Sequence, residues 1–134
     1  MTITAVWRIR GHDFDVEGFL SERPSLTPSF VWKKGDRRRG RRRKEEDSGA
    51  NIPLCEHPGI DSVMRVVRKW LILCRNDLRA LKRCGASSVL DLGVYVGSPE
   101  QFAARVEIQP DDALQLARAG VAVAVSAYPV SGDD

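Results

Sequence analysis

The stretch from residue 60 to residue 84 constrains the fold of this chain more than any other segment. Its apolar side chains recur with the spacing of one face of an α-helix: Ile60, Val63, Met64, Val67, Trp70, Leu71, Cys74, Leu78 and Leu81. The opposite face carries basic residues: Arg65, Arg68, Lys69, Arg75, Arg79, Lys82 and Arg83. Gly85 follows, as glycine often does after the last turn of a helix. We therefore expect one long amphipathic helix whose apolar face packs against another layer.

Five segments have the β-branched and aromatic composition of β-strands: residues 3–10, 30–32, 88–96, 102–108 and 121–128. The last of them is nearly continuously apolar, which is typical of a strand inside a sheet. Two short helices complete the pattern. Asp13 or Asp15 caps the first of them, and Pro110 with two following acids opens the second.

These elements follow one another in the order β-α-β, long α, β-β-α-β, which predicts a single α+β domain over residues 1–134. The sheet is expected to be antiparallel or mixed, with about five strands. The one long and two short helices are expected on one of its faces. The first and last thirds of the chain both show strand, short helix and strand, which suggests two related halves.

Positive charge is concentrated in two neighbouring segments, although the net charge is only +3. Residues 33–44 hold nine basic residues and one acid, and residues 61–84 hold seven basic residues and two acids. Residues 85–134 hold seven acids and two basic residues. Between residues 36 and 51 there is almost nothing to bury, so we expect a basic, mobile loop there.

The residues that carry enzyme or metal chemistry do not combine into a known pattern. Cys55 and His57 form only a two-ligand fragment, and no second Cys/His pair has zinc spacing. His12 stands alone, and capping explains the acids beside it. The sequence has no phosphate-binding loop, dinucleotide fingerprint or nucleophile elbow. We expect neither an enzyme nor a bound metal or cofactor.

The same sequence predicts a cytoplasmic protein with no membrane partner. No apolar run approaches the roughly 20 residues that span a bilayer. The first ten residues lack the basic and apolar segments of a signal peptide. Three cysteines, an odd number, indicate reduced thiols.

Three short motifs occur in order along the chain. They are RIRGHDFDVEGF at residues 8–19, Pro28 with Trp32-Lys33-Lys34-Gly35-Asp36, and VEIQPDDALQLARAGVAVAVSAY at residues 106–128. Together they resemble a bacterial domain-of-unknown-function family, number 4279. This chain has Val16 where the family often has proline, and an arginine run where the family has a tryptophan-containing segment. The resemblance implies a compact bacterial α+β domain without catalytic residues to carry over, and partners of the toxin–immunity kind.

The arginine run is the strongest candidate binding site in the sequence. We expect contacts from Trp32, Lys33, Lys34, Arg37, Arg38, Arg39, Arg41, Arg42, Arg43 and Lys44, with the basic helix face extending the footprint. Guanidinium groups bind carboxylates and phosphates in pairs of hydrogen bonds. The run therefore suits an acidic protein, such as a toxin bound by an immunity-type inhibitor, or nucleic acid with Trp32 stacked on a base. We favour the protein partner, because no nucleic-acid-binding motif is present and three acids follow the run directly.

Overall fold

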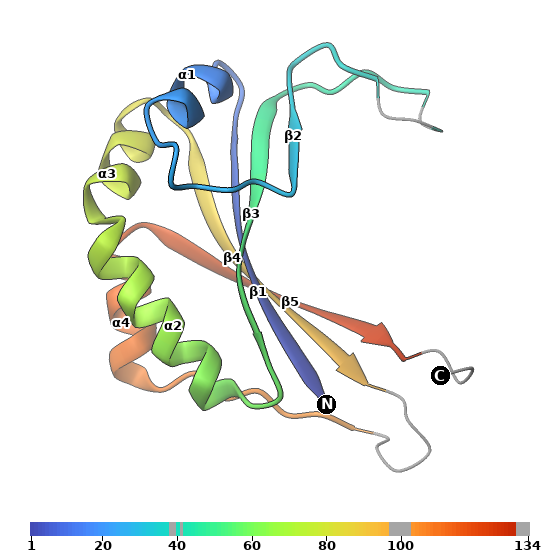
Figure 1. Cartoon of the computed structure of the whole chain (residues 1–134), viewed down its shortest axis with the longest axis vertical. Helices are drawn as coiled ribbons and strands as arrows, with labels where there is room; N and C mark the ends of the chain where they lie inside the picture. Colours follow the sequence, from blue (N-terminus) through green and yellow to red (C-terminus); the bar gives the residue numbers. More distant parts are fainter. Residues whose placement is uncertain (38–39, 41, 97–102, 131–134) are drawn as a thin grey trace.

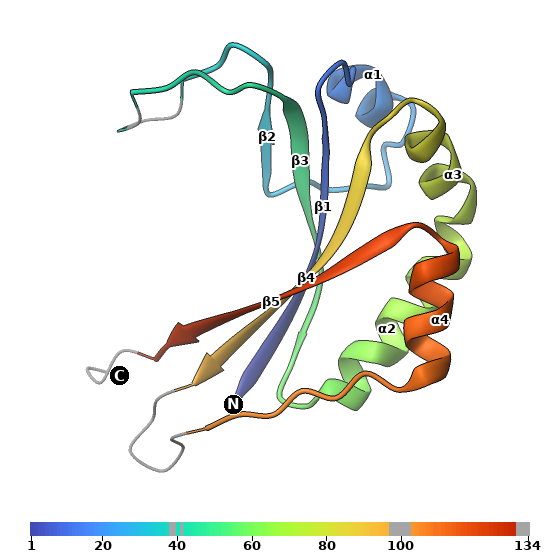
Figure 2. The same cartoon turned by 180° about the vertical axis from the view of Figure 1, so that it is seen from behind.

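The computed structural model of this chain describes residues 1–37, 40, 42–96 and 103–130. Within these residues, five strands form one mixed sheet in the order β2-β3-β1-β4-β5, and four helices accompany it (Figure 1). The predicted α+β class and single domain are confirmed. The helices α2, α3 and α4 lie together on one face of the sheet in both views (Figures 1 and 2).

The central strand β1 (Thr2–Gly11) organises the core. Its alternate side chains Ile3, Ala5, Trp7 and Ile9 are fully buried. β1 pairs antiparallel with β3 (Ser48–His57) on one side and with β4 (Ser87–Val96) on the other. The indole of Trp7 donates a hydrogen bond to Ser88 Oγ at 3.1 Å and packs edge-on against Trp70 of the helical layer. This contact fixes the helical layer against the middle of the sheet.

The helix expected over residues 60–84 is two helices, α2 (Ile60–Leu73) and α3 (Arg75–Arg83). Cys74, with φ −103° and ψ 15°, ends the first and begins the second. The predicted apolar face is buried on both sides of this break. Because sheets twist, one straight helix of this length would leave the sheet surface. The break lets α2 pack over β1 and β3 while α3 packs over β4.

Strand β3 corrects the expected boundaries of the basic loop. We expected a loop over residues 36–51, but Ser48 to Asn51 already belong to β3. The rest of β3 was not predicted because it contains Pro53, which has no backbone N–H to donate to a neighbouring strand. The structure accommodates the proline at a register shift, where the partner of β1 changes from Cys55 to Pro53 and Leu54 is left over.

The strand predicted over residues 102–108 is wrong for residues 103–108, which form no strand; Phe102 lies outside the described residues. This segment instead leads to α4 (Pro110–Arg118), whose first residue is proline as predicted. β4 and β5 (Val121–Pro129) are parallel, so the chain must cross over between them. Residues 103–118 make the described part of that crossover, and Val106 and Ile108 pack against the core.

The two ends of the sheet differ from what the sequence suggested. β5 is an edge strand, although its apolar composition predicted an interior strand. β2 (Phe30–Trp32) forms the other edge and pairs with β3 rather than with β1, so the first and last thirds of the chain are not equivalent. The short helix α1 (Val16–Ser21) is capped by Asp15, which accepts a hydrogen bond from the Gly18 N–H at 3.0 Å.

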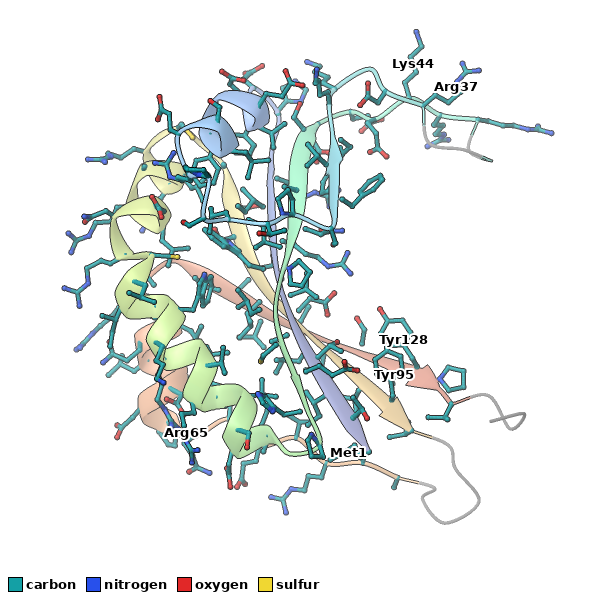
Figure 3. The ribbon with its side chains drawn as sticks, in the orientation of Figure 1. Met1, Arg37, Lys44, Arg65, Tyr95 and Tyr128 are labelled. Carbon is teal, nitrogen blue, oxygen red and sulfur yellow. The ribbon has the colours of Figure 1, made fainter. Side chains whose placement is uncertain are left out.

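The face of the sheet opposite α2, α3 and α4 carries paired polar groups and aromatic rings. Arg8 binds Asp91 at 2.8 Å. Tyr95 and Tyr128 stack with ring centroids 5.1 Å apart, and Figure 3 shows them side by side. No helix within the described residues is long and apolar enough to cross a membrane.

Replacing Trp7 tests the central position of β1. Trp7→Ala should lower the free energy of unfolding by about 3–5 kcal/mol, because it removes a fully buried indole and leaves a cavity. Phe30→Ala, at a side chain that is 42% exposed, is the control and should cost clearly less. Urea denaturation measures both values. Equal losses in the two variants would contradict the central role of Trp7.

Candidate functional site

The described part of the expected basic loop forms a projection that continues β2 and β3 beyond the sheet, and we name residues 33–37, 40 and 42–47 the basic projection (Figure 1). The Gly35 N–H donates to the Glu45 carbonyl at 2.8 Å, and the Glu45 N–H donates to the Asp36 carbonyl at 2.7 Å. A further antiparallel bridge joins Arg37 to Lys44. This paired backbone holds the start and the end of the arginine run side by side.

Trp32 does not have the exposed position that we expected of a stacking residue. Its side chain is 5% exposed, lies over Gly49 and stacks on Phe30 with ring centroids 5.9 Å apart. Its Nε1 donates to Asp47 Oδ1 at 2.9 Å, and Arg10 binds the other oxygen of Asp47 at 3.0 Å. Trp32 therefore anchors the base of the projection, and Phe30 is the aromatic ring that solvent reaches there.

The predicted cations of the projection fall into two groups. Lys33 is engaged by Glu17 at 2.5 Å, and this hydrogen bond raises the pKa of Lys33. Lys34 Nζ lies 3.3 Å from His12 Nε2. The following exposed cations have no carboxylate of a described residue within 4.0 Å: Arg37, Arg42, Arg43 and Lys44. Three further predicted residues lie outside the described part of the chain: Arg38, Arg39 and Arg41.

The two basic segments of the sequence are separated in space. Figure 3 shows Arg37 and Lys44 at the far end of the projection, and Arg65 on α2 on the other side of the molecule. The expectation that the basic helix face extends the footprint of the arginine run is therefore wrong. Each segment offers its own positive surface.

The second positive surface is a groove of about 650 Å³ between α2 and α3 on one side and α4 on the other. Its lining combines apolar and basic side chains: Arg68, Leu71, Ile72, Arg75, Leu78, Arg79, Lys82, Gln115, Arg118 and Ala119. We name these residues the basic groove. At its rim, Ile72 is 71% exposed, and the adjacent Leu73 is 82% exposed. Aliphatic side chains are rarely this exposed, because contact with water is unfavourable for them. Ile72 and Leu73 therefore form an exposed apolar patch of the kind found at binding surfaces.

One ion pair joins the two sides of the basic groove. Arg68 on α2 binds Asp112 on α4 through two hydrogen bonds of 2.8 Å each. These bonds lower the pKa of Asp112 and raise the pKa of Arg68. Asp112 is 7% exposed, so the ion pair with Arg68 neutralises its charge and leaves little of it for a ligand.

The other cations of the basic groove are not neutralised in this way. Within the described residues, no carboxylate lies within 4.0 Å of Arg75, Arg79, Lys82 or Arg118. Arg118 was not among the residues predicted from sequence, since only packing brings α4 beside α3. A cationic rim around an apolar floor suits a ligand that is anionic and apolar at once.

The histidines and cysteines do not converge on one another. His57 pairs with Ile3 at one end of the β1–β3 ladder, whereas His12 follows Gly11 at the opposite end. Burial raises the pKa of the thiols of Cys55 and Cys74, which disfavours the reactive thiolate. No group of three or more His, Cys, Asp or Glu side chains that could hold a metal occurs among the described residues.

Comparisons with protein-family models, with curated proteins and with solved structures gave no match. The resemblance to family 4279 therefore stays a prediction from the three sequence motifs.

Removing the Arg68 side chain tests the pair that holds α4 against α2. Arg68→Ala should destabilise the protein at neutral pH more than Arg65→Ala, because it leaves the buried Asp112 carboxylate unpaired. The ionised Asp112 carboxylate stabilises the folded state because the pKa of Asp112 is lowered there. This stabilisation is lost as the pH falls through the pKa of Asp112 in the folded protein. Urea denaturation from neutral pH to about pH 2 should therefore show the wild type and Arg68→Ala converging in acid. A difference that persists unchanged at the lowest pH would contradict this assignment.

Proposed function

We propose that this protein is a non-enzymatic binding protein of the bacterial cytoplasm whose partner is another protein. The basic groove is its main contact surface and receives an acidic, amphipathic segment of that partner. An immunity-type inhibitor that binds a protein toxin is the most concrete form of this function. Three free cysteines, two of them buried or partly buried, fit a reducing compartment.

The observation that carries the proposal is the combination of charge and apolar surface in the basic groove. Four cations there lack a carboxylate partner within the described residues, while Leu71, Leu78 and Ala119 form an apolar lining between them. Phosphates alone would use the cations but not the apolar lining. An amphipathic helix with acidic flanks uses both, in the manner of helix-in-groove recognition.

The residues at the rim are of the type that contribute most to protein interfaces. Arginine is enriched at interfaces because its planar group both stacks and forms paired hydrogen bonds. Ile72 adds a large, exposed aliphatic side chain to Arg75 and Arg79. The basic projection lies on the other side of the molecule and increases the positive field that an acidic partner meets. Such a field raises the association rate more than the affinity.

In-cell photocrosslinking tests the proposal directly. A photoreactive phenylalanine replaces Ile72 in the basic groove, and the same residue replaces Phe30 on the far side as a matched control. We expect a protein adduct from position 72 that survives nuclease treatment and is absent from position 30.

Charge reversal provides the control for the groove chemistry. The double variant Arg75→Glu, Arg79→Glu should abolish the adduct from position 72, while Arg65→Glu, outside the groove lining, should retain it. Adducts of equal yield from positions 72 and 30, or a nuclease-sensitive adduct, would contradict the proposal.

Nucleic-acid binding by residues 33–44 is the second candidate function. It is favoured by the exposed cations Arg37, Arg42, Arg43 and Lys44 on the basic projection. The burial of Trp32 and the distance between the two basic surfaces count against it, because Trp32 was the ring predicted to stack on a base and because the separation interrupts a continuous phosphate track.

Fluorescence anisotropy with random RNA and duplex DNA at two salt concentrations separates the two functions. Our proposal expects weak binding that serine at Arg37, Arg42 and Arg43 changes little. Tight binding that weakens steeply with salt, by a slope of roughly −0.9 per neutralised phosphate on duplex DNA, and that these three substitutions remove, would favour the nucleic-acid function instead.

A further inference from the structure

The outer edge of β5 is the least protected part of the sheet. Within the described residues, β5 pairs with β4 alone, so its other side presents unpaired backbone N–H and C=O groups. The nine paired residues follow β4 from Ser88 to Val96 without a register shift, so no bulge bends the edge away. Such an edge is a template for another strand.

Apart from Ser126, the side chains along this edge are apolar, and several are exposed on each face of the sheet. The register places Val123 beside Leu90 and Val125 beside Leu92 on the face that the helices cover. Leu90 and Leu92 are fully buried, whereas Val123 is 41% and Val125 is 58% exposed. Tyr128 on the opposite face is 38% exposed. α4 covers only the start of the strand, where Val121 is 6% exposed.

β5 lacks the charged residues and internal proline that usually prevent an edge strand from pairing with another chain. Its sequence, VAVAVSAYP, has no charged residue, and its one proline is the last residue. The opposite edge is protected, since β2 has three residues and is followed at once by Lys33 and Lys34. The composition that predicted an interior strand is therefore found on an edge that no described strand pairs with, which favours a partner strand there.

We propose that a second copy of this chain covers the edge, by antiparallel pairing of β5 with β5 of the partner. An antiparallel two-fold pairing over all nine residues places Val125 opposite Val125 of the partner subunit. Apart from Ser126, apolar side chains then meet apolar side chains on both faces. The helices of both copies share one side of a continuous ten-stranded sheet.

The charge distribution favours β5 as the surface at which two copies meet. Two copies repel each other at the basic projection and along α2 and α3, where the chain is strongly positive. The uncharged β5 edge is a surface that two copies can share without this cost. It also gives a charged partner nothing to recognise. Because β2 has only three residues and two lysines follow it, pairing through β5 closes as a dimer and does not grow into a fibre.

Molar mass in solution tests the dimer without reference to the basic groove or to the proposed function. Light scattering of the purified chain at micromolar concentration should give twice the 14.9 kDa of one chain. Val125→Lys, which places a charge at the two-fold axis, should give a monomer. Leu73→Lys, at a side chain that is 82% exposed on the helical side, should remain a dimer. A monomeric wild type, a larger assembly, or a dimeric Val125→Lys would overturn the proposal.

A cysteine at the axis keeps the proposal testable if Val125→Lys fails to fold. Directly opposite residues of an antiparallel pair lie at a separation that suits a disulfide. In a Cys84→Ser background, Val125→Cys should form a disulfide-linked dimer under mild oxidation, whereas Leu73→Cys should not. Equal cross-linking of the two variants would show random collision and would overturn the pairing.

Discussion

The structure depends on β1 being fully buried on one face only. Ile3, Ala5, Trp7 and Ile9 point into a core that α2, α3 and α4 complete, while the alternate residues Arg8 and Arg10 are exposed on the other face. This one-sided burial gathers the helices into a single layer, and the Trp7–Trp70 contact sets where that layer sits. The basic groove exists because three helices share one face and the short α4 fills only part of it.

The charges of the chain are distributed so that some hold the fold and others stay available. Three arginines form ion pairs within the fold: Arg68 with Asp112, Arg8 with Asp91, and Arg10 with Asp47. The cations that line the basic groove beyond Arg68 have no such partner among the described residues. This division distinguishes a structural ion pair from the proposed binding surface, although both use arginine. If β5 pairs two copies, both grooves lie on one side of the shared sheet, and a partner that presents two acidic segments gains by being held at both.

Periodicity and capping predicted the local elements well. The alternation in β1, the apolar face of residues 60–84, one of the two candidate caps (Asp15, not Asp13) and the proline that opens α4 all appear in the structure. The features that were not predicted depend on packing between segments far apart in the sequence. The break at Cys74 follows the twist of the sheet and has no glycine or proline to announce it. Pro53 made the β3 sequence look unlike a strand. Residues 103–108 form no strand because they belong to the crossover between β4 and β5. The basic groove was beyond prediction because Arg68 and Asp112 are 44 positions apart.

We propose that a protein partner contacts this chain through the basic groove. Hydrogen–deuterium exchange of the chain with and without the captured partner tests it most directly, because exchange reports on every backbone amide at once. We expect slower exchange in residues 68–82 and 115–119 on binding, with the basic projection changed little. Protection confined to residues 33–44, or no protection in α2, α3 and α4, would contradict it.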